Sequence, residues 1–166
     1  MDILKNLSNG EIIGCLITLA LAIIGGIYKI LEQYKKKKEE GYNSIGTYEL
    51  SSYAFATDGI KADPRVHFKV TSGQIRISDI EIVNQNNSTS IILNESEFKN
   101  KILLVGNSYN IITLKTNNNV SLNQDYDNYP IINITYSDIN SKYYKIDTIK
   151  ILYKKNTTEL ISSKRI

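Results

Sequence analysis

The 166-residue chain lacks tryptophan and contains one histidine, one cysteine and two prolines. With Cys15 as its single cysteine it cannot form an intrachain disulfide. His67 and Cys15 together are too few ligands for an ordinary zinc site. The sequence also lacks a nucleophile elbow, a phosphate-binding loop and a dinucleotide fingerprint. We therefore expect a protein that is not an enzyme and that needs no cofactor or metal.

A strong excess of one charge is also missing. Residues 1–40 contain 6 basic and 5 acidic groups, a net charge of +1, and residues 41–166 contain 14 basic and 12 acidic groups, a net charge of +2. Proteins that bind nucleic acids need a broad basic surface to neutralise phosphates. We therefore expect no nucleic-acid partner.

One long apolar run is present, "IIGCLITLALAIIGGIY", from Ile12 to Tyr28. Extended to Ile30 it has 19 residues, or about 28 Å of helix at a rise of about 1.5 Å per residue. That length is close to the roughly 30 Å of hydrocarbon in a bilayer. The run predicts a transmembrane helix over residues 12–30.

Two other interpretations of this run are open. A buried core helix would need helical partners, which the rest of the sequence does not offer, and this run is apolar on every face. A cleaved signal peptide would use Lys5 as its basic region and Ala20-Leu21-Ala22 as its small-residue cleavage site. Against cleavage, the apolar run continues to Ile30, and Asp2 lies close to Lys5.

Lysines predict the orientation of this helix. Four consecutive lysines follow the apolar run, whereas Lys5 alone precedes it; the four are Lys35, Lys36, Lys37 and Lys38. Short flanks rich in lysine stay on the cytoplasmic side of a membrane. We expect a single-pass protein of the inner (cell) membrane, with residues 1–11 outside the cytoplasm and residues 41–166 inside it.

Helical spacing continues past the apolar run. We therefore expect a basic juxtamembrane helix and linker over residues 31–46, in which the helix reaches about Glu40 and ends at Gly41. Ala22 and Gly26 form a small-xxx-small pair, which lets two membrane helices approach closely. This pair predicts a homo-oligomer formed through the helix. Cys15 is interpreted as a small apolar filler.

Beyond Gly41 the hydrophobic pattern changes from helical to alternating. Val66, Phe68 and Val70 share one face of a strand, and His67 lies on the other. Similar short segments are separated by turns and by polar loops. The expected strands cover residues 47–55, 65–70, 74–84, 89–93, 101–105, 109–115, 131–138 and 142–155. The pattern predicts a mainly β fold, an antiparallel immunoglobulin-like β-sandwich over residues 47–155, with a small β-barrel as the alternative.

Two strands change phase within their length. Ile75 and Ile77 lie in one phase and Ile80 and Ile82 in the other, which predicts a β-bulge or a break at residues 78–79. A second change of phase is expected at residues 147–148. Residues 156–166 are expected to add an edge strand or to remain a loose tail.

The polar segment 116–130 is the most function-like part of the sequence. It contains Asp125, Tyr126, Asp127 and Tyr129. Oxygen ligands would suit calcium, but the spacing matches no EF-hand loop. Tyrosine and asparagine are typical of binding loops, and recognition commonly lies on loops. These four residues are our predicted partner-binding loop, and a solvated connection is the alternative.

Three segments resemble a loose group of small bacterial and prophage single-pass membrane proteins that carry a cytoplasmic immunoglobulin-like sandwich. They are the apolar run 12–28, the strand "IRISDIEIVN" (75–84) and the hairpin "ITYSDINSKYYKI" (134–146). The resemblance implies a tethered β domain. It also implies the alternative that such proteins act as anti-phage effectors, whose β domain senses a ligand and whose membrane helices assemble to breach the bilayer.

Two functional hypotheses follow. In the first, the helix tethers a β-sandwich that binds a protein partner at the cytoplasmic membrane surface, where tethering raises local concentration. In the second, the chain is a membrane-disrupting sensor or effector that oligomerises through its helix.

Overall fold

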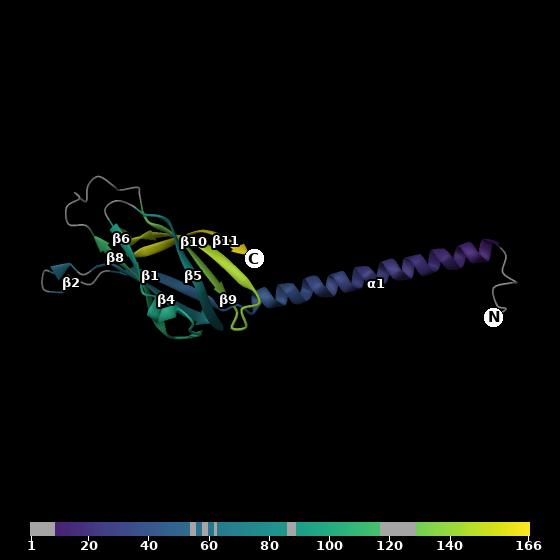
Figure 1. Cartoon of the computed structure of the whole chain (residues 1–166), viewed down its shortest axis with the longest axis horizontal. Helices are drawn as coiled ribbons and strands as arrows, with labels where there is room; N and C mark the ends of the chain where they lie inside the picture. Colours follow the sequence, from purple (N-terminus) through teal and green to yellow (C-terminus); the bar gives the residue numbers. More distant parts are fainter. Residues whose placement is uncertain (1–8, 54–55, 58–59, 62, 86–88, 117–128) are drawn as a thin grey trace. The chain divides into compact units, whose positions relative to one another are not determined.

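The computed structural model of the chain describes residues 9–53, 56–57, 60–61, 63–85, 89–116 and 129–166 (Figure 1). It divides into two compact units, Met1–Glu40 and Gly41–Ile166. The first unit is helical and the second is mainly β.

Helix α1 runs from Asn9 to Asn43. Among the described residues it is the one helix that is long and apolar enough to span a membrane, with a mean hydropathy of 2.2 over its most apolar window. None of that window is buried within the chain itself. The expected helix over residues 12–30 is therefore present, and the interpretation as a buried core helix is not supported.

The helix continues two residues beyond the end expected at Gly41. Tyr42 is buried in the β domain, and its hydroxyl donates a hydrogen bond to the carbonyl oxygen of Ile166. A Cβ on Gly41 would lie 2.2 Å from ring atoms of Tyr143. Gly41 is thus explained by the close approach of an aromatic ring to the backbone, and packing around Tyr42 holds the last helical turn.

Among its described residues, the β unit contains two larger antiparallel sheets and a short two-stranded one. In spatial order, the first contains β1 (Thr47–Tyr53), β4 (Arg65–Ser72), β8 (Ser108–Thr116) and β6 (Thr89–Leu93). The second contains β11 (Thr157–Arg165), β10 (Tyr144–Leu152), β9 (Ile131–Ser137), β5 (Gln74–Asn84) and β7 (Leu103–Leu104). The shorter elements are β2 (Ala56–Thr57), β3 (Ile60–Lys61), α2 (Glu95–Phe98) and the 3-10 helix η2 (Tyr153–Lys155).

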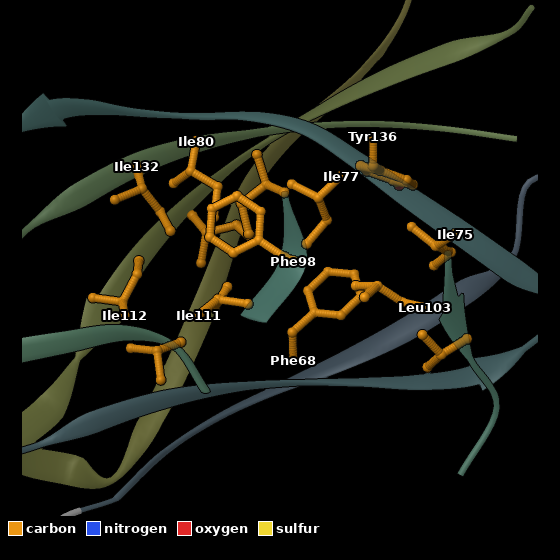
Figure 2. Packing of buried hydrophobic residues seen from close by; sticks show 14 of the residues in the cluster. Phe68, Ile75, Ile77, Ile80, Phe98, Leu103, Ile111, Ile112, Ile132 and Tyr136 are labelled. Atoms are coloured by element: carbon orange, nitrogen blue, oxygen red, sulfur yellow. The ribbon is translucent and has the colours of Figure 1, made fainter. Parts of the chain in front are cut away.

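Apolar side chains from both sheets fill the space between them (Figure 2). Phe68 from β4 and Ile77 from β5 are at most 1% exposed, as are Ile112 from β8 and Ile132 from β9. Burial of such side chains is worth roughly 1.5–3 kcal/mol each. The described strands thus form a sandwich-like arrangement of two sheets around one core.

The alternation predicted for two strands is confirmed. In β4, Val66, Phe68 and Val70 are fully buried, whereas His67 is half-buried. In β9, every second residue from Ile132 is buried. Gly73 forms the turn between β4 and β5 with φ of +65°, a conformation that glycine adopts without strain.

The change of phase predicted in β5 is a β-bulge. The register between β5 and β9 shifts between Ile77 and Asp79, and β5 continues as one strand of 11 residues. The bulge lets Ile75, Ile77 and Ile80 all reach the core although their spacing is irregular.

Sequence reasoning missed the short helix α2. The segment between β6 and β7 was expected to be a polar loop, but Phe98 is 3% exposed and packs in the core. One helical turn brings this single aromatic residue inward from a segment rich in polar residues. The strand expected over residues 101–105 is correspondingly reduced to Leu103–Leu104.

The change of phase predicted in β10 is wrong. β10 pairs with β9 without any shift of register, and Asp147, Ile149 and Ile151 are all buried on the same face. The irregularity is instead in the pairing of β10 with β11, where Thr148 pairs with Ser162 and Ile149 with Leu160. Asp147 thus faces inward, in phase with the isoleucines, although aspartate is rarely buried.

Candidate functional site

A buried carboxylate joins four strands of the β domain. Asp147 of β10 is 5% exposed. Its Oδ2 accepts hydrogen bonds from the hydroxyls of Tyr48 at 2.5 Å and of Tyr136 at 2.9 Å, and its Oδ1 accepts one from Ser163 at 2.5 Å. Because the donors come from β1, β9 and β11, the carboxylate connects both sheets. We call these four residues the Asp147 cluster.

The cluster leaves Asp147 without an ion-pair partner among the residues that the structure describes. Burial of an unpaired carboxylate is costly unless hydrogen bonds compensate for the lost hydration. Three hydroxyl donors supply that compensation, and bonds to a charged acceptor are stronger than neutral ones. The arrangement therefore preserves a negative charge inside the domain.

The two tyrosines are held in their neutral form. Burial raises the pKa of Tyr48, and the hydrogen bond to Asp147 and the charge of that carboxylate raise it further. Burial also raises the pKa of Tyr136, followed by the charge of Asp147 and the hydrogen bond to it. Both hydroxyls therefore remain protonated donors at any physiological pH.

A pocket of about 390 Å³ lies over the cluster, between β1 on one side and β9, β10 and β11 on the other. Besides the members of the Asp147 cluster, its lining includes the aliphatic side chains of Leu50, Ile149 and Leu160 and the hydroxyl residues Thr47 and Thr158. Lys145 and Gly46 complete the lining. The volume is within the range of small-molecule sites.

β1 and β11 are the edge strands of their sheets on this side of the sandwich. The Thr158 hydroxyl donates a hydrogen bond of 3.4 Å to the carbonyl oxygen of Leu50 and so connects the two edges. The pocket therefore lies between two sheet edges, a position at which a side chain or a small molecule can enter without opening a sheet.

A second buried carboxylate is structural. Asp138 accepts backbone hydrogen bonds from Lys142 and Tyr143 at its Oδ1 and from Asn140 at its Oδ2. Burial alone would raise the pKa of Asp138, but the backbone donors at Tyr143, Lys142 and Asn140 outweigh it and lower the pKa. This carboxylate holds the turn between β9 and β10.

His67 lies on β4 and pairs with Asn110 of β8. Its Nδ1 lies 3.4 Å from the hydroxyl of Ser108. Burial and then the positive charge of Arg65 lower the pKa of His67, and Glu97 opposes the shift. In the described part of the chain, His, Cys, Asp and Glu side chains form no group of three that could hold a metal ion.

Of the predicted partner-binding loop, Asp125, Tyr126 and Asp127 lie outside the described residues. Tyr129 is described: its ring makes an edge-to-face contact with Tyr153 at 5.7 Å between centroids and packs against the core. Partner binding by this loop remains a prediction.

The residues predicted to act at the membrane all lie in α1 and are exposed: Ala22, Gly26, Lys35, Lys36, Lys37 and Lys38. No atom lies within 4 Å of a Cβ built on Gly26, apart from its own helix and chain neighbours. The helix therefore leaves room for a close neighbour at Gly26. The contact itself remains a prediction, as does the orientation.

The Asp147 cluster was not found from the sequence. The signal was the spacing of Asp147 from Ile149, Ile151 and Tyr153, which places the carboxylate on the apolar face of a regular strand. A polar residue in an apolar phase indicates either a change of phase or a buried network, and the sequence was interpreted as a change of phase at residues 147–148.

The arrangement as a whole offers a hydrogen-bonded negative charge beneath a pocket and an exposed apolar helix in the other unit. The resemblance to small bacterial and prophage membrane proteins remains a prediction. Comparison of the chain with models of protein families, with curated proteins and with solved structures found no match.

Proposed function

We propose that this protein is a membrane-tethered interaction module, in which α1 crosses the inner membrane and the β domain binds a protein partner at the cytoplasmic surface. The observation that carries the proposal is the exposure of α1. Its large aliphatic side chains between Ile12 and Leu31 are all at least 37% exposed.

Such exposure in water is unfavourable. Transfer of a large aliphatic side chain out of water is worth roughly 1.5–3 kcal/mol. Eleven isoleucines and leucines are exposed between Ile12 and Leu31, so insertion of the helix into hydrocarbon is worth on the order of 10 kcal/mol or more. This gain supports a bilayer as the environment of the helix.

The lysines that follow the apolar part of α1 support a cytoplasmic β domain. Lys35, Lys36, Lys37 and Lys38 are exposed, and lysines in short flanks resist translocation. The fold fits an adaptor role because the β unit Gly41–Ile166 forms its own compact core, and loops on such a scaffold commonly bind partners.

We further propose that the β domain is immunoglobulin-like. The spatial order β1-β4-β8-β6 corresponds to the ABED sheet of constant-type immunoglobulin domains, and β10-β9-β5 corresponds to GFC. β11 would then be an added strand next to G. The antibody-type pair of cysteines and the tryptophan are absent from the sequence, so the correspondence is one of strand order.

Orientation is tested with two reporters fused after Ile166 of the full-length chain. Alkaline phosphatase is active outside the cytoplasm and green fluorescent protein is fluorescent inside it, so we expect fluorescence without phosphatase activity. Replacement of Lys35–Lys38 by glutamine should increase phosphatase activity. Replacement of Lys99 and Lys101, distant in sequence from the helix, is the control and should change neither signal. Phosphatase activity in the unmodified chain would refute the orientation.

Partner binding is tested by a photo-crosslinking amino acid at Tyr126 of the full-length chain in its native membrane. We expect one discrete crosslinked protein. The same probe at Lys69, an exposed residue of β4, should give none. If probes throughout residues 117–128 trap no protein, the proposed binding loop is wrong.

A further inference from the structure

The pocket over the Asp147 cluster has a chemistry that the proposed function does not use. Each hydroxyl of the cluster has one proton, and Tyr48, Tyr136 and Ser163 all donate theirs to Asp147. Their oxygens therefore have only lone pairs left for any other group. The polar floor of the pocket consequently presents hydrogen-bond acceptors.

The negative charge beneath the pocket also favours a cationic ligand. The carboxylate of Asp147 is buried and has no ion pair among the described residues. Lys145 lines the pocket two residues away on the same strand, but no salt bridge joins it to Asp147. An anion would be repelled by the carboxylate and would find few donors, whereas a cation with several N–H groups would satisfy both charge and hydrogen bonding.

We propose that this pocket binds an aliphatic primary ammonium group, as carried by a free polyamine or by a lysine side chain. Leu50, Ile149 and Leu160 supply apolar walls for its alkyl chain. The ammonium group lies over the hydroxyl oxygens and the carboxylate of the cluster. The inference is independent of the membrane tether and of the loop 116–130.

The geometry favours ammonium over guanidinium. A guanidinium group binds a carboxylate through two parallel hydrogen bonds, one to each oxygen. Here Oδ1 is occupied by Ser163 and Oδ2 by two tyrosines. A compact ammonium can instead direct its three donors to separate oxygens.

The test uses the full-length chain in detergent micelles, with backbone amide signals followed by NMR. The probes are n-butylammonium, spermidine and the blocked peptide acetyl-Gly-Lys-Gly-amide. n-Butanol is the neutral control of matched shape, and butyrate is the anionic control. We expect saturable shifts at Asp147 and Ser163 with the amines and none with the two controls.

Two variants test the charges of Asp147 and Lys145 one at a time. Asp147→Asn keeps the shape of the side chain but removes its charge, and should weaken amine binding by about tenfold or more. Lys145→Gln removes a competing cation beside the pocket and should strengthen binding by about two- to threefold. An anion site would respond to both variants in the opposite direction.

Spermidine and the lysine peptide distinguish the two sources of the amine, because the one that binds more tightly identifies the natural ligand class. The proposal is overturned if no amine produces saturable shifts, if n-butanol or butyrate binds as well as butylammonium, or if Asp147→Asn retains full affinity. If the Asp147→Asn variant does not fold, as shown by the loss of its dispersed NMR spectrum, the Lys145→Gln variant is the deciding one. Amine binding to Lys145→Gln that is unchanged or weaker than binding to the unmodified chain then overturns the proposal. None of these results affects the topology or crosslinking tests.

Discussion

Removal of the two tyrosine hydroxyls from Asp147 tests whether the cluster is a cooperative network. Tyr48→Phe and Tyr136→Phe each delete one donor, at 2.5 Å and 2.9 Å from Oδ2, and leave the aromatic packing in place. A hydrogen bond to a charged group is worth about 1.5–3 kcal/mol. Because two donors remain after either change, we expect each variant to lose about 1.5–2 kcal/mol of unfolding free energy.

The double variant should lose more than the sum of the single variants. With both phenols gone, Oδ2 has no donor among the described residues and a buried carboxylate is left half satisfied. We expect a loss of about 4–6 kcal/mol, a large part of the 5–15 kcal/mol typical of a whole domain. Such coupling is the signature of residues that share one partner.

The measurement is urea unfolding of the full-length chain in micelles, followed by near-ultraviolet circular dichroism of tyrosine because the chain has no tryptophan. Tyr144→Phe is the matched control on β10, since the Tyr144 hydroxyl has no hydrogen-bond partner in the described part of the chain. It should change stability by less than about 0.5 kcal/mol. Additive or negligible losses in the double variant would refute the network.

Two further predictions concern the same domain. The pKa values of Tyr48 and Tyr136 are raised in the folded chain, so the unfolded chain releases these protons near pH 10 while the folded chain keeps them. The contribution of the two phenols to stability is therefore complete below pH 10 and should fall as the pH rises above it. Absorbance at 295 nm should show these two phenols ionising only with unfolding, and their titration near pH 10 in the folded state would contradict this prediction. Gly41→Ala should cost about 1–3 kcal/mol of unfolding free energy because the added Cβ overlaps the ring of Tyr143. Gly25→Ala should not destabilise the chain, because no atom outside its own helix and chain neighbours lies within 4 Å of the added Cβ. Equal midpoints of urea unfolding for the two variants would contradict the proposed contact.

Hydrophobic periodicity was sufficient to predict most of the fold. The apolar run indicated α1, and the alternation of Val66, Phe68 and Val70 indicated a strand with one buried face. Turns and polar loops separated the expected strands. These signals are local, so they can be recognised without knowing which strands pair.

Periodicity did not predict burial where a single residue differs in polarity from its sequence neighbours. Phe98 lies in a polar segment, and only the tertiary structure shows that one helical turn brings it into the core. Asp147 is the opposite case, a charged residue on an apolar face. Its donors are 99, 11 and 16 residues away in sequence, so no local pattern could reveal that its burial is compensated.

The position of Asp147 has a consequence for the edge of the sheet. β11 is an edge strand with Leu160 and Ile161 more than half exposed, and the unpaired backbone groups of an edge strand can pair with other chains. The Ser163 hydroxyl anchors β11 to the carboxylate, and the Thr158 hydroxyl anchors it to β1. An ammonium group that donates to Oδ1 of Asp147 would share that oxygen with the Ser163 hydroxyl. Binding in the pocket and the attachment of β11 therefore involve the same carboxylate. An amine that binds there should change hydrogen exchange along β11 more than along β4. β4 is the reference because it lies in the other sheet and does not line the pocket.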